Sequence, residues 1–364
     1  MLFLDFGDGQ TAAGCFFECG LGFARRFATY KRPNLLLQDP ARLLRLMTDE
    51  DRPVQLIIAG KAHPEDRGGQ ELIHQWMEFI RQPDSRSHVI FLSDYDMLLT
   101  ESLVHGVDVW INTPRRPWEA CGTSGMKVLV NGGINLSELD GWWAEAYTPD
   151  VGFAVGDGQE HGEDPAWDAR DARTLYELLE QKVVPEFYAR DKNGIPVAWI
   201  NRIRESMARL TPRFSADRAV RQYTEQRYLP AAAEYTSRQQ NKGAIGKLIV
   251  DWQRRLNQNW AKLRFGQVKI ETRKDRHLFE VPVYSEDVDP AEMRVELYAN
   301  GVESSAPVRE EMKRTRQLSA PERGYVYTAE VSASRPREDY TARIIAMLSG
   351  AAVPLESPQV LWQR

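Results

Sequence analysis

The sequence is poor in cysteine and has neither a long apolar run nor a marked surplus of one charge. Its three cysteines among 364 residues are too few for a disulfide framework, which favours a reducing, cytoplasmic compartment. Cys15 and Cys19 are of a residue type that binds zinc, but no second pair of ligands lies at a suitable spacing, so we predict no metal site. No apolar run could span a bilayer, and the opening MLFLDFGDG lacks the basic segment of a secretory signal.

Charge and composition narrow the class further. The chain has 47 Lys+Arg against 52 Asp+Glu, a formal net charge of -5, which gives no field favouring nucleic acid or an anionic membrane surface. The six histidines show no spacing typical of a catalytic triad or a metal centre. A hydrophobic content of 42% supports sizeable cores, and the length predicts two domains. Ten tryptophans are compatible with carbohydrate contact, although tryptophan more often belongs to a core.

The first part of the chain alternates between buried-strand and amphipathic-helix patterns. We predict strands at residues 16–24, 54–59, 89–92, 107–111 and 133–136, and helices at 34–47, 69–80, 97–104 and 124–130. This rhythm is typical of a doubly wound parallel sheet of the α/β class. Such sheets bind ligands at the carboxyl ends of their strands, so the informative residues should directly follow each strand.

The rest of the sequence, from residue 168 on, shows a helical pattern followed by a strand pattern. Residues 168–238 read as mostly helical. The stretch 239–263 is polar, basic and aromatic; a nucleic-acid contact is one interpretation, and a solvated helix with two packed tryptophans is the favoured one. From residue 265 the apolar period becomes two, which predicts an all-β sandwich. We therefore predict an unmatched lead-in at 1–19, an α/β domain at 20–238, a helical linker at 239–264 and a β module at 265–364.

The strongest chemical signal is the segment EACGTSGMK, Glu119–Lys127. It follows a predicted strand, its small residues let backbone N–H groups approach a ligand, and it leads into a helix whose N-terminus favours anions. A lysine in the first turn of that helix would lie among positive charges, which favours the neutral amine that a Schiff base needs. An ordinary strand–loop–helix turn with a solvated lysine explains the same spacing equally well.

This segment resembles the one that reads Glu-Ala-Ser-Gly-Thr-x-x-Met-Lys in the glycogen and α-glucan (maltodextrin) phosphorylases. The resemblance implies that Lys127 carries pyridoxal 5'-phosphate and that Thr123 lies beside the cofactor phosphate. It also implies that Glu119, Cys121 and Gly122 contact the glucosyl unit. Cys121 stands in place of the commoner serine, so a backbone N–H contact survives the change but a hydroxyl contact does not. The continuation NGGINLSELDGWWAE favours the short bacterial and archaeal type.

Further blocks in the order of that family support the resemblance. RRFATYKR, Arg25–Arg32, is similar to the family's Lys-Arg-x-x-x-Tyr-Lys-Arg. It implies that Arg26 holds the substrate phosphate and that Arg25 and Lys31 approach the cofactor phosphate, with Arg25 in place of a lysine. The blocks GKAHP at 60–64 and VIFLSDYDMLLTE at 89–101 follow, and they put Tyr95 and Glu101 near the active site. The resemblance covers roughly residues 20–240.

The resemblance implies the C-terminal half of the two-domain GT-B glycosyltransferase fold, with a helical extension and an all-β module. It also implies reversible, retaining phosphorolysis of α-1,4-glucan to glucose 1-phosphate, with Arg26, Lys31 and Lys127 as catalytic residues. The family's N-terminal domain has no counterpart here, so our hypothesis is a truncated or split chain, whose partner could be a separate N-terminal phosphorylase domain. Two alternatives are a nucleotide-sugar glycosyltransferase of the glycogen synthase type and a non-catalytic fragment that binds glucan or a partner through its β module.

Overall fold

The computed structural model describes residues 18–302, 306–319 and 323–363, so Cys15 and most of the predicted lead-in lie outside the described residues. The chain divides into two compact units, with the boundary between Arg221 and Gln222. In the described ranges no helix is both long and apolar enough to cross a membrane. Within the same ranges, no three His, Cys, Asp or Glu side chains gather as a metal site would need.

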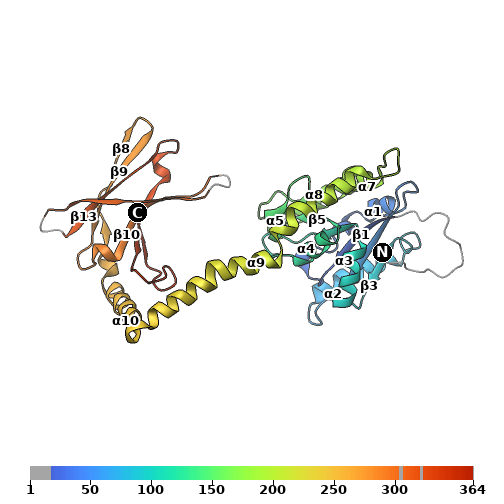
Figure 1. The fold of residues 1–364 in the computed structure, drawn as a ribbon. Helices are drawn as coiled ribbons and strands as arrows, with labels where there is room; N and C mark the ends of the chain where they lie inside the picture. Colours follow the sequence, from blue (N-terminus) through green and yellow to red (C-terminus); the bar gives the residue numbers. More distant parts are fainter. Residues whose placement is uncertain (1–17, 303–305, 320–322, 364) are drawn as a thin grey trace. The chain divides into compact units, whose positions relative to one another are not determined.

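The first unit is built on a parallel six-stranded sheet with the strand order β3-β2-β1-β4-β5-β6 (Figure 1). This is the order of a doubly wound sheet, as the alternating sequence pattern predicts. Between β1 and β4 the winding direction reverses, and the carboxyl ends of these two strands therefore open a crevice. The strands are β1 (Cys19–Ala24), β2 (Val54–Ala59), β3 (Val89–Leu92), β4 (Val109–Asn112), β5 (Ile134–Glu138) and β6 (Phe153–Val155).

Helices cover both faces of this sheet (Figure 1). One face packs against α1, α2, α6 and α7, and the other packs mainly against α3 and α4, with α5 and α8 extending the second layer. The helices are α1 (Pro40–Met47), α2 (Arg67–Ile80), α3 (Met97–Gly106), α4 (Thr123–Val130), α5 (Gly141–Ala146), α6 (Pro165–Leu178), α7 (Val184–Tyr188) and α8 (Val197–Arg213).

Alternation along β1 sets the two layers. Leu21 and Phe23 enter the larger core, whereas Gly22 points to the opposite face. A Cβ atom on Gly22 would lie 2.8 Å from a Val107 methyl, so only glycine lets the second layer approach this closely. A Cβ atom on Gly60, just past β2, would lie 2.1 Å from the carbonyl oxygen of Arg25. That close approach holds the segment after β1 against the end of β2.

Most predicted elements of this unit are confirmed, with shifted ends. β2 and β3 match their predicted ranges. The predicted helix at 34–47 is wrong at its start, because residues 35–38 form a 3-10 turn and α1 begins at Pro40, after Asp39 caps the Arg42 N–H at 2.9 Å. The predicted strand 107–111 begins and ends later, as β4. The sequence patterns missed α5 and β6, both too short to show a period.

The second unit begins within a helical stretch. α9 (Ala216–Tyr223) is capped by the Ser215 hydroxyl, which accepts from the Arg218 N–H at 3.2 Å. A π-helical segment at 224–228 leads into α10 (Leu229–Asn259), whose backbone breaks at residues 240–243. Trp252 on α10 is fully buried against the β module and Trp260 packs beside it, as the interpretation of a helix with two packed tryptophans requires.

The β module is a sandwich of two antiparallel sheets, which confirms the predicted all-β class. Their orders are β11-β10-β14-β15 and β12-β13-β9-β7, with β8 paired to β9. The strands are β7 (Arg264–Phe265), β8 (Lys269–Arg273), β9 (Arg276–Tyr284), β10 (Met293–Ala299), β11 (Val308–Glu311), β12 (Lys313–Gln317), β13 (Gly324–Ser332), β14 (Thr341–Ala346) and β15 (Val360–Trp362). Inward residues of both sheets form one core with α10.

Candidate functional site

Two segments meet in the crevice between the carboxyl ends of β1 and β4. The first runs from Arg25 to Arg32 after β1, and the second runs from Thr113 to Glu119 after β4. The Arg115 N–H donates to the Tyr30 carbonyl at 2.7 Å and ties the two together. Residues far apart in the sequence thus share the position at which open α/β sheets bind their ligands.

Three charged side chains from these segments form the first cluster. Lys31 Nζ lies 2.8 Å from Glu119 Oε2, and Arg25 Nη1 lies 3.2 Å from the same oxygen. Both cations are buried at the residue level. Burial lowers the pKa of Arg25 from its ordinary value, while the Glu119 carboxylate opposes that change. We call these three residues the cation-rich cluster, because two cations share one carboxylate.

The backbone around Glu119 is fixed. Its N–H donates to Asp140 Oδ2 at 2.8 Å, at the start of α5. The neighbouring Trp118 packs on Tyr30, with ring centroids 5.9 Å apart. These contacts hold the Glu119 carboxylate where the two cations reach it.

Arg26 points away from this cluster, because side chains of an extended chain point alternately to opposite sides. Its side chain is exposed, whereas Arg25 and Phe27 on either side are buried. The predicted pair Arg25 and Lys31 is thus brought together with Glu119, and Arg26 stays on the surface beside them.

A groove beside the cation-rich cluster holds the predicted lysine. It has a volume of about 700 Å³ and lies between the start of α3 and one side of α4. Lys127, Thr123, Tyr95 and Glu101 all line it. The Tyr95 hydroxyl donates to the Ala24 carbonyl at 3.3 Å, directly before Arg25, so Tyr95 joins the groove to the cluster.

The position of Lys127 on its helix corrects one expectation. α4 begins at Thr123, so Lys127 is the fifth residue and lies in the last turn rather than the first. The positive end of the helix is at Thr123, so the amine does not lie at that end of the helix dipole. Lys127 is exposed, and its amine has no hydrogen bond or ion pair with any described residue.

The turn before α4 is held by close backbone packing. Gly122 has a φ of 86°, a left-handed conformation that favours glycine at this cap. Cys121 accepts the Trp142 N–H at 2.9 Å through its carbonyl, so the turn rests on α5. Its side chain is exposed. The Cys121 and Gly122 backbone is thereby fixed between Glu119 and the groove.

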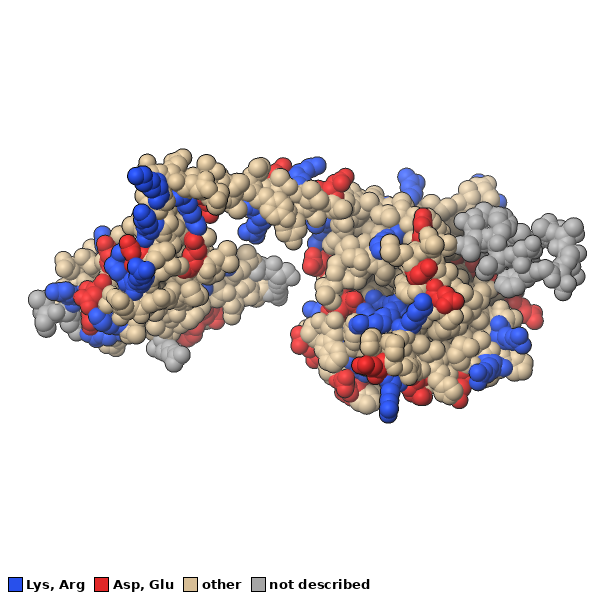
Figure 2. Space-filling view, turned by 90° about the horizontal axis from the view of Figure 1, so that it is seen from below, with Lys and Arg blue, Asp and Glu red and all other residues tan. Residues whose placement is uncertain are grey.

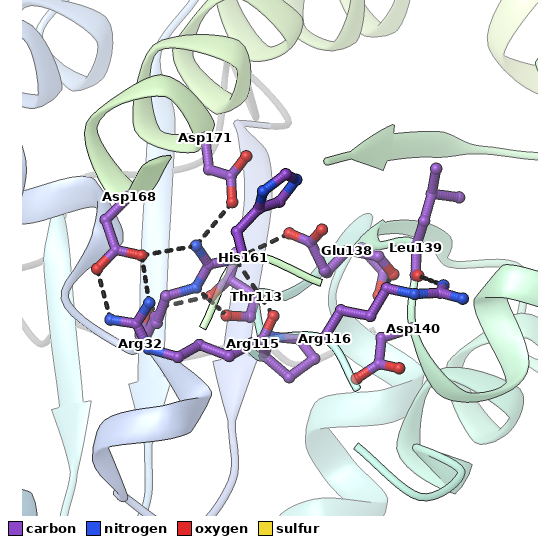
Figure 3. Close-up of polar contacts among 12 residues, drawn as sticks. Arg32, Thr113, Arg115, Arg116, Glu138, Leu139, Asp140, His161, Asp168 and Asp171 are labelled. Carbon is purple, nitrogen blue, oxygen red and sulfur yellow. Dashed lines mark hydrogen bonds and ion pairs between the residues drawn. The ribbon is translucent and has the colours of Figure 1, made fainter. Parts of the chain in front are cut away.

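A second charged cluster, which sequence patterns did not predict, lies at the same edge of the sheet. Arg32 donates to Asp171 at 2.7 Å, to Glu138 at 2.8 Å and to Asp168 at 3.0 Å (Figure 3). Arg115 adds two hydrogen bonds to Asp168, at 2.8 and 2.5 Å. We call these five residues the acid-rich cluster, since three carboxylates share two guanidinium groups.

Burial is the strongest influence on the pKa values in the acid-rich cluster. Desolvation, together with the nearby Asp171 carboxylate, raises the pKa of Glu138 from 4.5 to about 8, although Arg32 opposes the change. The pKa of Asp171 is also raised by burial. Burial opposes the charge of Arg32, but the surrounding carboxylates outweigh it and raise the pKa of this guanidinium. Among the carboxyl groups of this cluster, Glu138 therefore has the strongest tendency to keep a proton as the pH rises.

Comparisons with known proteins match the part of the chain that holds this site. The family model described as carbohydrate phosphorylase matches residues 23–177, which include both clusters and the groove. The matched part of the chain belongs to the carbohydrate phosphorylase family. It is 44% identical over 248 residues to the glycogen phosphorylase of Mycobacterium tuberculosis, and 37% identical over 302 residues to the maltodextrin phosphorylase of Thermococcus litoralis. These alignments cover 68% and 82% of this chain.

The relatives are much longer than this chain. It spans 29% of the Mycobacterium tuberculosis enzyme and 35% of the Thermococcus litoralis enzyme. A glycogen phosphorylase of Aquifex aeolicus, 44% identical over 208 residues, is matched over 30% of its length. The chain thus spans about a third of the length of the curated relatives it matches.

Proposed function

We propose that this chain is the phosphate- and cofactor-binding part of an α-glucan phosphorylase. The reaction is reversible, retaining phosphorolysis of α-1,4-glucan to glucose 1-phosphate. The observation that carries the proposal is the cation-rich cluster at the crevice of the sheet, next to a groove lined by Lys127. The identity to glycogen and maltodextrin phosphorylases over most of the chain supports the same reaction.

The charge of the cluster favours a phosphate. Arg25 and Lys31 share the single carboxylate of Glu119, which leaves one positive charge uncompensated among these side chains. A buried, uncompensated cation is unfavourable, so binding an anion relieves that penalty. Charge-assisted hydrogen bonds from arginine and lysine to phosphate are also among the strongest in proteins. The exposed Arg26 offers a further donor for a substrate phosphate.

Lys127 and its surroundings fit pyridoxal 5'-phosphate. The exposed amine has no partner among the described residues and faces a groove large enough for a small ring. Thr123, at the N-terminus of α4, offers a hydroxyl and the positive end of the helix to the cofactor phosphate. Tyr95 lies between this groove and Arg25. When bound, the cofactor supplies a phosphate that exchanges a proton with the substrate phosphate.

The remaining residues orient the reactants. Arg25 and Lys31 hold the two phosphates together against their mutual repulsion. The Glu119 carboxylate accepts hydrogen bonds from the glucosyl hydroxyls once anions engage its two cations. The backbone N–H groups of Cys121 and Gly122, fixed by α5, donate to the sugar.

We infer that turnover needs residues beyond those that the structure describes. Phosphorolysis requires a closed cleft that excludes water and aligns phosphate with the glycosidic carbon. The groove beside Lys127 is open, and the chain spans about a third of the length of its relatives. A separate N-terminal phosphorylase domain is the partner we propose, with glucan, phosphate and glucose 1-phosphate as ligands.

Mass analysis after borohydride reduction tests the proposal. The purified full chain is incubated with pyridoxal 5'-phosphate, reduced, digested and analysed by mass spectrometry, with absorbance spectra taken before reduction. We expect a pyridoxyl adduct on Lys127 that is lost in Lys127→Ala. Lys192→Ala is the matched control, because Lys192 is an exposed lysine on a loop of the same unit.

The outcomes separate the candidate functions. An adduct on Lys127 alone supports the phosphorylase, since a nucleotide-sugar transferase of the glycogen synthase type needs no such lysine. A folded chain without an adduct overturns the proposal and favours that transferase or a non-catalytic glucan-binding role. Adducts spread over many exposed lysines, unchanged by Lys127→Ala, also overturn it.

A further inference from the structure

The outer face of one sheet of the β module carries a cluster of aromatic and charged side chains. Along β10, Val295 and Leu297 point into the core of the sandwich, while Glu296 and Tyr298 point outward. The pairing of β10 with β14 and of β14 with β15 brings Arg343 and Trp362 next to them. Four side chains from three strands therefore share one patch, which we call the aromatic patch.

Arg343 organises the aromatic patch. Its guanidinium carbon lies 4.4 Å from the centre of the Tyr298 ring and 5.0 Å from the Trp362 ring. The two rings meet edge to face, with centroids 5.4 Å apart and an interplanar angle of 82°. Arg343 Nε donates to Glu296 Oε1 at 2.6 Å, and Arg294 pairs with the other oxygen at 3.2 Å. The carboxylate, 5% exposed, thus anchors a stack that holds both rings in place.

Trp362 keeps much of its surface in water despite these contacts. It is 41% exposed, and Val360 on the same short strand is 37% exposed. Among the described tryptophans, only Trp362 and Trp118 have a comparable exposure, and Trp118 lies beside the candidate active site. A large aromatic side chain that is both rigid and exposed is typical of a binding surface rather than of a core.

The chemistry of the patch selects a neutral, hydroxyl-rich ligand. Charged side chains of both signs surround the patch, with Arg309 and Glu311 on β11 beside Arg294, Glu296 and Arg343. Figure 2 shows Lys and Arg interspersed with Asp and Glu on the visible surface of this unit. Such a surface gives no field for a polyanion or a polycation. A pyranose ring instead offers an apolar C–H face to an aromatic ring and hydroxyl groups to neighbouring charged side chains.

We propose that the aromatic patch binds α-glucan chains, with Trp362 as the stacking residue and Arg343 as the donor to sugar hydroxyls. The choice of α-glucan rests on the proposed function. Similarity to the maltodextrin phosphorylase supports it, because an alignment over 82% of this chain is longer than the part before residue 264 and so enters the β module. The patch tethers a long glucan and raises its local concentration at the candidate active site.

Affinity electrophoresis of the full chain in native gels containing amylopectin tests this inference, with calorimetry against maltoheptaose as the quantitative measurement. We expect retardation by amylopectin that Trp362→Ala abolishes, a loss of at least tenfold in maltoheptaose affinity, and partial retention in Trp362→Phe. Tyr235→Ala is the matched control, because Tyr235 is a 65% exposed aromatic on α10 and away from the sheet. It should bind as the wild type does.

Other outcomes overturn the inference. One such outcome is that amylopectin does not retard the wild type. Another is that Trp118→Ala removes the retardation while Trp362→Ala leaves it unchanged. A shift from dimer to monomer in Trp362→Ala, seen by sedimentation without any glucan effect, would assign the patch to a second copy of the chain instead. Lys127→Ala should not alter retardation, so a failed cofactor test and a failed patch remain distinguishable. Near-UV circular dichroism of Trp362→Phe verifies that the module is folded.

Discussion

The two charged clusters at the carboxyl edge of the sheet both use the loops after β1 and β4, yet they hold opposite surplus charge, because β5 and α6 add carboxyl groups to the second cluster. Lys31 belongs to the cation-rich cluster, and the next residue, Arg32, belongs to the acid-rich one. Arg32 has a left-handed φ of 44°, which turns the chain so that adjacent side chains diverge. Within the first cluster the surplus charge is positive and suits an incoming anion. Within the second cluster the surplus charge is negative, and a proton kept on Glu138 reduces it.

The comparison teaches how to separate a binding site from a structural one. Both clusters contain buried arginine and short ion pairs, so neither feature alone identifies function. The acid-rich cluster satisfies its arginine from within, through three carboxylates and the carbonyls of Thr113 and Pro114. In the cation-rich cluster two cations compete for one carboxylate. An unbalanced cation in a crevice is the more specific sign of an anionic ligand.

The largest expected effect comes from removing the centre of the acid-rich cluster. Arg32→Met leaves the buried carboxyl groups of Glu138 and Asp171 without their arginine partner, so we expect a loss of about 3–5 kcal/mol in the free energy of unfolding. Urea denaturation of the full chain measures it. Arg52→Met, which removes an exposed ion pair with Asp49, is the control and should change stability by about 0.5 kcal/mol at most. A loss for Arg32→Met as small as the control would show that the cluster is not structural.

The next largest effect is on phosphate affinity, which should depend on the cation-rich cluster and not on the acid-rich one. Lys31→Met should weaken binding of inorganic phosphate to the full chain by about tenfold, the loss of one charge-assisted hydrogen bond. Glu119→Gln should instead tighten it several-fold, because the competing carboxylate is gone. Isothermal titration calorimetry measures both. Glu138→Gln, in the acid-rich cluster, should leave phosphate affinity unchanged, and weaker binding in Glu119→Gln would contradict the charge argument.

The pH dependence of stability tests the retained proton. The pKa of Glu138 is raised to about 8 from 4.5, so between these values the folded chain binds a proton that the unfolded chain releases. Its contribution to stability is therefore complete below pH 4.5 and is lost as pH rises toward 8, by at most about 1.4 kcal/mol per pH unit. Urea midpoints from pH 5 to 9 should show a shallower decline in Glu138→Gln than in the wild type. Parallel curves would rule out Glu138 as the proton carrier.

The smallest effect separates charge from geometry. Arg115→Lys keeps the charge but loses the two parallel hydrogen bonds to Asp168, so we expect a loss of about 1 kcal/mol in stability. Arg115→Met removes the charge as well and should cost more. Thermal unfolding of the two variants under one buffer condition makes the comparison. Equal losses would mean that the charge of Arg115 contributes nothing beyond its hydrogen bonds.

The sequence by itself determined the α/β class, the β module and the candidate residues of the cation-rich cluster. Strand periods and small residues are local signals, and the blocks around Arg25 and Glu119 are contiguous motifs whose resemblance to the phosphorylases can be seen without a fold. The roles of Lys127, Arg26 and the other site residues stay predictions, because they depend on ligands.

Only the tertiary structure decided which charged residues meet. The carboxyl partners of Arg32 lie 106 to 139 positions away along the chain, and no local period links them. It also decided the helix register that puts Lys127 in the last turn of α4, since Gly122 rather than a side-chain cap starts that helix. The aromatic patch likewise arises from strand pairing, which joins β10, β14 and β15 through backbone hydrogen bonds that leave little trace in the sequence. Local sequence signals determine the helices and strands, and long-range packing determines which of their side chains come into contact.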